Sequence, residues 1–178
     1  TTAGGQGYPA AAGLSNGGYV VAWIGQDSSG GNAVYTQRYD SNGTKVGAET
    51  HIADAPVGTA NCDLPSVTRV GDGYVLSWMV QTAADSWDIV LQRFSNAGAK
   101  VGAEGHVNTY TTGAQAYPEV IALGDGGYLV TWSSSGQDGS GYGVYAQRYD
   151  AAGAKAGAEV EVNTYTDSAQ YVSTAAAL

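Results

Sequence analysis

One pattern of glycine, aromatic and basic residues recurs about every 55 residues along this chain, in three copies. Its fixed points are a tryptophan on an apolar run and an arginine that follows a glutamine, found at Trp23, Trp78 and Trp132 and at Arg38, Arg93 and Arg148. A period of this length indicates stacked supersecondary units. We therefore predict a single repeat domain over residues 1–178, with repeats at about 6–60, 61–114 and 115–169 and an extra strand at 170–178.

Each copy contains four short runs suited to β-strands, separated by clusters of Gly, Asn, Asp and Ser. In the third copy the runs are 117–123, 127–133, 143–149 and 154–162. The second run is apolar on both faces and the fourth is polar, as expected from the inner to the outer strands of a propeller blade. We predict an all-β fold of three four-stranded antiparallel repeats resembling β-propeller blades, with a β-trefoil as the alternative.

The chain begins with a copy of the first run at 8–14 and ends with another at 171–178. Three blades are too few to close a ring, because propellers have about four or more. Three arrangements stay open: further chains complete the ring, the last strand is donated to a neighbour, or the chain is part of a longer array. We expect that last strand, with Tyr171, Val172 and Leu178, to be ordered and paired with a sheet edge.

The charge balance limits the partners. Seven Lys and Arg stand against sixteen Asp and Glu, a net charge of −9, which repels phosphate backbones and anionic lipids. We therefore expect no nucleic-acid partner and no membrane insertion. The single cysteine, Cys62, makes no intrachain disulfide. An acidic chain rich in Gly, Asn, Thr and Ser is more typical of a secreted bacterial protein, located outside the cell or on its surface.

The recurring side chains are interpreted as structural. We expect the three tryptophans to pack in the core. We expect the three arginines to tie one repeat to the next through backbone carbonyls or a carboxylate, the recurring carboxylates being Glu49, Glu104 and Glu159. His51 and His106 are also 55 residues apart, but they lack the local spacing of a zinc-binding pair, so we interpret them as structural.

The connection between the second and third runs differs between copies, and function on a repeated scaffold usually lies in variable loops. Asp27 and Asp138 are the candidate ligands there for Ca²⁺, although each loop offers one or two carboxylates and a good site needs about six to eight oxygens. A solvated turn is the favoured interpretation. Trp87, flanked by Asp85 and Asp88, is a candidate for stacking on a sugar ring.

The third copy reads Gly127-Tyr128-Leu129-Val130-Thr131-Trp132 and later Val162-Asn163-Thr164-Tyr165-Thr166. With the Gln137 to Asp150 stretch between them, it resembles tandem repeats in large bacterial surface and secreted proteins of the RTX and adhesin type. The resemblance covers nearly the whole chain. It implies export without disulfides, frequent Ca²⁺ binding, and a role in adhesion, biofilm or extracellular structure. The Asp-rich nonapeptide calcium repeats of that group are absent from this sequence.

We therefore predict a non-catalytic extracellular repeat protein that acts in adhesion or self-assembly. Its partners would be copies of itself or neighbouring repeats, joined by strand exchange, and surface glycans. The alternative is a lectin, with a glycan held by Trp87, Tyr110, Tyr142 and Tyr165 and nearby Asp oxygens. A glycan-cleaving enzyme ranks third, because the repeat pattern singles out no pair of acids and no nucleophile elbow is present. An enzyme is therefore not expected.

Overall fold

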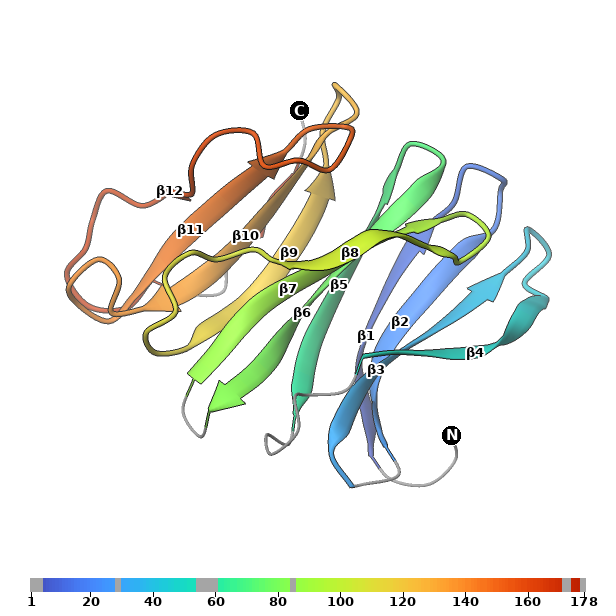
Figure 1. Cartoon of the computed structure of the whole chain (residues 1–178), viewed down its shortest axis with the longest axis horizontal. Helices are drawn as coiled ribbons and strands as arrows, with labels where there is room; N and C mark the ends of the chain where they lie inside the picture. Colours follow the sequence, from blue (N-terminus) through green and yellow to red (C-terminus); the bar gives the residue numbers. More distant parts are fainter. Residues whose placement is uncertain (1–4, 28–29, 54–60, 84–85, 171–173, 177–178) are drawn as a thin grey trace.

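The computed structural model describes residues 5–27, 30–53, 61–83, 86–170 and 174–176. These residues form twelve β-strands in three four-stranded antiparallel sheets, one for each repeat (Figure 1). We call the sheets blade 1, blade 2 and blade 3. The prediction of an all-β fold with three four-stranded repeats is confirmed. The described part of the chain holds no helix with the length and apolar character of a membrane span.

The strands of each blade pair in the order in which they follow along the chain. Blade 1 contains β1 (Gln6–Gly13), β2 (Tyr19–Gln26), β3 (Asn32–Tyr39) and β4 (Lys45–Ala53). Blade 2 contains β5 (Cys62–Val70), β6 (Gly73–Ala83), β7 (Ser86–Ser95) and β8 (Lys100–His106). Blade 3 contains β9 (Gln115–Ala122), β10 (Tyr128–Ser135), β11 (Tyr142–Tyr149) and β12 (Val160–Glu161).

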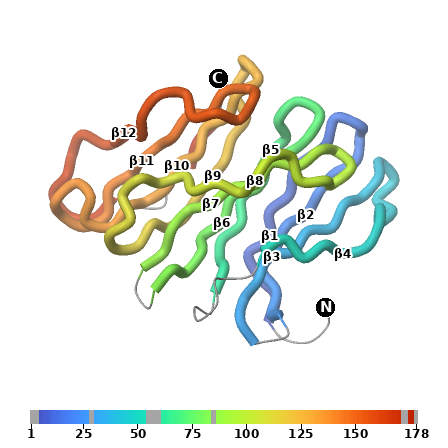
Figure 2. Tube along the Cα trace, viewed as in Figure 1, coloured from blue at the N-terminus to red at the C-terminus, as the bar shows by residue number. Residues whose placement is uncertain are grey.

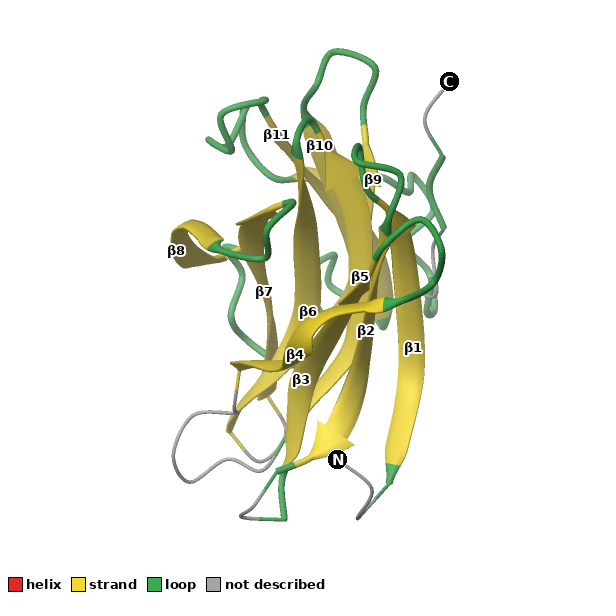
Figure 3. Cartoon of the chain, turned by 90° about the vertical axis from the view of Figure 1, so that its right-hand side faces the viewer, coloured by secondary structure: helices red, strands yellow, loops and turns green. Residues whose placement is uncertain are grey.

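The first strands of the blades lie side by side. β5 contacts β1, and β9 contacts β5, so the three inner strands are neighbours, and the blades follow one another across the molecule (Figure 2). Seen from the side, β1 and β9 lie on one flank of the molecule and β8 on the other (Figure 3). This is the gradient from inner to outer strand that the sequence predicts.

The core consists of the two layers between neighbouring blades. One layer packs Val20, Ala22 and Ile24 of β2 against Tyr74, Leu76 and Trp78 of β6. The other packs Val75 and Met79, from the opposite face of β6, against Tyr128, Val130 and Trp132 of β10. The central blade is therefore buried on both faces, and the second run of each repeat supplies the largest share of the core.

The recurring tryptophans confirm the packing prediction in two blades out of three. Trp78 and Trp132 are 1% and 0% exposed, each covered by the preceding blade, whereas Trp23 is only half-buried because the structure holds no blade before blade 1. In all three blades an aromatic pair stacks across the second and third strands, with ring centroids 4.8 or 4.9 Å apart. The pairs are Tyr19–Tyr39, Tyr74–Phe94 and Tyr128–Tyr149.

The recurring arginines tie each blade to the next through backbone carbonyls, as the sequence predicts. Arg38 Nη1 donates to the carbonyl oxygen of Asn96, at 3.1 Å. Arg93 donates in the same way to the carbonyl oxygens of Ala151, at 3.1 Å, and Ala152. All three acceptors lie in the turn before the fourth strand of the following blade.

Two lysines make the reciprocal contact. Lys100 at the start of β8 reaches back to the carbonyl oxygen of Ile52 in blade 1, at 3.4 Å. Lys155 reaches back to the carbonyl oxygen of Val107 in blade 2, at 2.8 Å. Glu159 is one of the glutamates predicted as alternative partners of the arginines, and it has another role. Its Oε2 accepts from the backbone N–H of Thr109 at 2.8 Å.

The fourth strand of blade 3 is shorter than predicted. Instead of spanning 154–162, β12 holds two residues, preceded by an isolated bridge between Tyr149 and Lys155. Glu159 in this segment accepts hydrogen bonds from the backbone N–H and the hydroxyl of Thr109 in blade 2, contacts that Glu104 of β8 does not make with any described residue. The outer edge of blade 3 is therefore less regular than that of the other two blades.

The expected C-terminal strand is described only in part, because Tyr171, Val172 and Leu178 lie outside the described residues. Gln170 and residues 174–176 carry no strand assignment. The backbone N–H of Ala175 nevertheless donates to Glu119 Oε2 on β9, at 2.9 Å. Between β9 and β5, the N–H of Val120 donates to Ser66 Oγ in a similar way, at 3.1 Å. Residues 174–176 thus lie beside β9 much as β9 lies beside β5.

Candidate functional site

Each inner strand carries one irregularity at the same place in the repeat. Tyr8, Leu64 and Tyr117 have positive φ values of 50°, 47° and 57°, and each is followed by proline. Non-glycine residues rarely adopt this conformation, which costs on the order of 1–3 kcal/mol and is concentrated at functional sites. The pairing register of β1 with β2 and of β5 with β6 shifts at this point. The strained residues therefore mark one feature that three strands build together.

These irregularities surround a shallow depression of about 320 Å³ at the centre of the inner strands. Its lining is mostly apolar and aromatic, and comprises Tyr8, Pro9, Leu64, Pro65, Tyr117, Pro118, Glu119 and Thr174. The rings of Tyr8 and Tyr117 are 59% and 40% exposed. An open surface with exposed aromatic rings and a single carboxylate suits a flat, polar ligand such as a sugar.

Glu119 is the carboxylate in this depression, and it breaks the repeat. The residue that follows the inner-strand proline is Ala10 in blade 1 and Ser66 in blade 2. The half-buried Glu119 side chain accepts the hydrogen bond from Ala175 through Oε2. An acid is present here in one blade only, which is what a single site on a repeated scaffold requires.

Asp63 is a second acid that breaks the repeat; it lies on β5 beside Leu64, which lines the depression, but is not itself part of the lining. It directly precedes Leu64, and its counterparts before Tyr8 and Tyr117 are Gly7 and Ala116. Burial raises the pKa of the Asp63 carboxyl, and the hydrogen bond that Oδ1 accepts from the Leu64 N–H, at 2.8 Å, lowers it to a smaller extent. The net effect raises the pKa, which is the direction expected for a general acid.

Sequence analysis missed both acids, although a signal was present. Neither residue belongs to the pattern that the three copies share, but Asp63 and Glu119 are detectable as positions where one copy alone carries an acid. The positive φ values had no such signal, because tyrosine and leucine before proline do not indicate a left-handed conformation.

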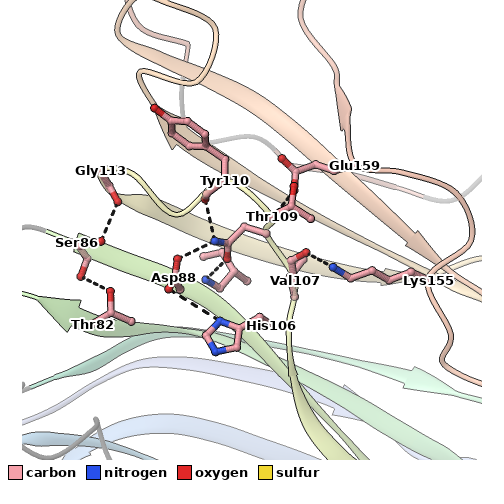
Figure 4. Close-up of polar contacts among 12 residues, drawn as sticks. Thr82, Ser86, Asp88, His106, Val107, Thr109, Tyr110, Gly113, Lys155 and Glu159 are labelled. Carbon is pink, nitrogen blue, oxygen red and sulfur yellow. Dashed lines mark hydrogen bonds and ion pairs between the residues drawn. The ribbon is translucent and has the colours of Figure 1, made fainter.

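Asp88, by contrast, belongs to a structural network in blade 2 (Figure 4). Its carboxylate is 5% exposed, and Oδ1 accepts from Asn108 Nδ2 at 2.7 Å. Asn108 Oδ1 in turn accepts from the backbone N–H of Ile89 at 2.7 Å, and His106 Nδ1 lies 3.9 Å from Asp88 Oδ2. Asn163 repeats the main contact in blade 3 by accepting from the Val144 N–H. The network fixes the outer strand to its neighbour.

The other predicted sugar-binding residues do not line the depression. Trp87 lies on β7 and not in a loop, because β7 begins at Ser86, and its side chain packs against the core layer between blades 2 and 3. Tyr142 packs against the same layer. Tyr165 is 66% exposed and follows β12, which is at the opposite edge of blade 3 from β9. Tyr110 is half-buried, and Asp85 lies outside the described residues.

The predicted calcium ligands cap their own turns. Asp27 Oδ1 accepts from the Gly31 N–H, and Asp138 Oδ1 from the Ser140 N–H, each at 3.0 Å. Within the described ranges, no group of three or more His, Cys, Asp or Glu residues is placed to hold a metal ion. His51 lies against the ring of Tyr35, with centroids 5.1 Å apart, in keeping with its structural interpretation.

The comparisons with known proteins rest on structure alone. No protein-family model matches the chain, and no curated protein is similar to it. An endo-arabinase from Bacteroides thetaiotaomicron is similar with a TM-score of 0.56 at 16% identity, over 88% of this chain and 61% of that one. An endo-1,4-beta-xylanase from the same organism gives 0.56 at 9% identity, over 89% and 61%.

A family 43 endo-arabinanase from Bacillus licheniformis gives a TM-score of 0.53 at 14% identity, over 83% of this chain and 55% of that one. This chain therefore spans between 55% and 61% of the length of these three enzymes. They are five-bladed β-propellers. The three sheets are propeller blades.

This finding corrects the prediction that the protein is not an enzyme. That prediction assumed that a repeated scaffold offers no unique site, but the solved structures similar to these blades are glycoside hydrolases. Asp63 and Glu119 show how a repeat can carry a unique site, since single acids replace Gly, Ala or Ser at otherwise equivalent positions. At 9–16% identity the likeness establishes the fold.

Proposed function

We propose that this protein acts on glycans and cleaves them at the central depression of its inner strands. The observation that carries the proposal is the placement of Asp63 and Glu119 on neighbouring inner strands, next to the strained residues Leu64 and Tyr117. The fold shared with arabinan- and xylan-cleaving enzymes supports the same class of substrate.

The two acids match the division of labour in glycoside hydrolysis. One carboxyl must be protonated to donate to the leaving oxygen, and the other must be ionised to act as base or nucleophile. Asp63, with its raised pKa, is assigned the proton-donating role, and Glu119 the role of the carboxylate. Tyr8 and Tyr117 would hold the sugar rings by stacking. The net charge of −9 favours neutral glycans over acidic ones.

The test is release of reducing ends from arabinan and xylan by the full chain. We expect cleavage by the wild-type protein and a loss of about a hundredfold or more in Glu119→Gln and Asp63→Asn. Glu104→Gln is the matched control, because Glu104 is an exposed glutamate on the outer strand β8. No release by the wild-type chain, or equal rates in wild type and Glu119→Gln, would refute the assignment.

Glycan binding without cleavage is the second candidate, favoured by the exposed rings of Tyr8 and Tyr117. In that case the wild-type chain would bind arabinan or xylan oligosaccharides in calorimetry and release no reducing ends. Tyr8→Ala and Tyr117→Ala would then weaken binding, and Glu119→Gln would bind as the wild type does. Tyr165→Ala, which removes an exposed tyrosine outside the depression, is the control.

A further inference from the structure

The outward face of blade 1 has the chemistry of an interface between blades. Tyr19, Val21, Trp23 and Tyr39 are half-buried on it. Their counterparts in blade 2 are Tyr74, Leu76, Trp78 and Phe94, which blade 1 covers to exposures of 2%, 0%, 1% and 3%. The face of blade 1 is hollowed instead into a depression of about 380 Å³, which Trp23, Tyr39 and Lys45 help to line.

The polar contacts between blades follow one rule at both internal interfaces. The arginine of the third strand donates forward to the turn before the next blade's fourth strand, as Arg38 and Arg93 do. The lysine just after that turn donates backward to the end of the preceding blade's fourth strand, as Lys100 and Lys155 do. Each interface therefore has two reciprocal links.

Blade 1 and blade 3 each carry one of these two donors without a contact to another blade. Arg148, the forward donor of blade 3, pairs with Asp125 of its own blade and is exposed. Lys45, the backward donor of blade 1, has no hydrogen bond or ion pair with any described residue. The matching acceptors are also present: the turn at 41–42 in blade 1 corresponds to the turn that Arg38 contacts in blade 2, and Val162 corresponds to Ile52 and Val107.

We propose that a second copy of this chain docks head to tail on this surface. Blade 3 of one copy covers Trp23 and Tyr39 of the other, Arg148 donates to the carbonyl oxygens of its 41–42 turn, and its Lys45 donates to the carbonyl oxygen of Val162. The two surfaces in contact are different faces of the chain, so the contact is heterologous and joins copies head to tail. The partner is identified by continuity with the two interfaces inside the chain.

Residues 174–176 occupy part of this interface in the single chain. They lie beside β9, where β1 of the second copy would pack, and the Ala175 N–H to Glu119 is their hydrogen bond to that strand. They make no strand ladder within the described residues. In the assembly β1 of the second copy takes their place.

The test is the mass of the full chain in solution, measured by sedimentation equilibrium over a wide concentration range. We expect species of two or more times the 18.1 kDa chain mass. Arg148→Ala and Lys45→Ala should each weaken association about tenfold or more, because each removes a charged hydrogen-bond donor. Arg69→Ala, which removes an exposed arginine on β5, should associate as the wild type does.

Mixing the two variants separates a head-to-tail contact from any other. Arg148→Ala retains an intact blade 1 face, and Lys45→Ala retains an intact blade 3 face, so the mixture restores one complete interface. We expect the mixture to associate more tightly than either variant alone. A chain that stays monomeric at every concentration, or a mixture no tighter than its components, would overturn the proposal. Circular dichroism of each variant establishes that it is folded.

Discussion

Arg38 on β3 donates a hydrogen bond from Nη1 to the carbonyl oxygen of Asn96 in blade 2, at 3.1 Å. Two residues further along that turn is Gly98, which has a positive φ of 81°. A Cβ atom at this position would come within 2.7 Å of Arg38 Nε. The glycine therefore serves two purposes, since it permits the turn and leaves room for the arginine of the preceding blade.

Gly98→Ala should consequently destabilise the protein more than Gly102→Ala. Both glycines are in blade 2 at positive φ, which costs an alanine about 1–2 kcal/mol. A Cβ at Gly102 meets open space, whereas at Gly98 it displaces Arg38 and costs about 1 kcal/mol more through the lost hydrogen bond. Urea unfolding of the two variants measures the difference. Equal free energies of unfolding would show that the arginine link contributes nothing.

The tryptophans allow a comparison between equivalent positions in covered and uncovered blades. Trp78→Ala removes a fully buried indole from the layer between blades 1 and 2, and should cost about 3–5 kcal/mol of unfolding free energy. Trp23→Ala removes a half-buried indole at the same point of the repeat, and should cost less than half as much at concentrations where the chain is monomeric. Denaturant unfolding of both variants tests this ratio.

The sequence predicts what the three copies share. The apolar second run, the hairpin turns and the recurring Trp and Arg residues identify the strands, the core layers and the links between blades, because each feature depends on side chains that repeat. The prediction fails where local sequence carries no signal. The positive φ of Tyr8, Leu64 and Tyr117 is imposed by neighbouring inner strands, and the contacts that shorten β12 come from blade 2.

The candidate site was missed for a related reason. Variation between the copies indicates a loop at Trp87, but this residue belongs to β7 and the core partly covers it. Asp63 and Glu119 lie within strands, where an isolated acid is easily read as a solvent-facing residue. Their significance depends on the central position of the inner strands, which only the assembly of the blades reveals.

The network at Asp88 predicts a large difference between two asparagines at equivalent positions. Asn108→Ala leaves a buried carboxylate and the Ile89 N–H without their partner, so we expect a loss of about 2–3 kcal/mol. Asn163→Ala removes the corresponding contact to Val144 from the more exposed edge of blade 3, where water can replace it. Its loss should be below about 1 kcal/mol. Thermal and urea unfolding provide the comparison, and a similar loss in both variants would contradict it.

Asp63 gives the protein a specific pH dependence. Burial raises the pKa of its carboxyl in the folded state above the ordinary value of 3.8, so the folded state binds this proton more tightly than the unfolded chain does. Stability associated with this group is therefore present below pH 3.8 and declines as the pH rises from there through the folded-state pKa. This sign is opposite to that of a salt-bridged carboxylate.

Asp63→Asn removes the titration and retains an oxygen that can accept from the Leu64 N–H. We therefore expect the unfolding free energy of the variant to fall less than that of the wild type as the pH rises. At neutral pH it should equal or exceed the wild-type value. Asp40→Asn is the control, because the Asp40 side chain caps an exposed turn. Urea unfolding at closely spaced pH values above 3.8 measures the slopes. If Asp63→Asn is less stable than the wild type at neutral pH, the carboxylate is stabilising and the acid role assigned to Asp63 is wrong.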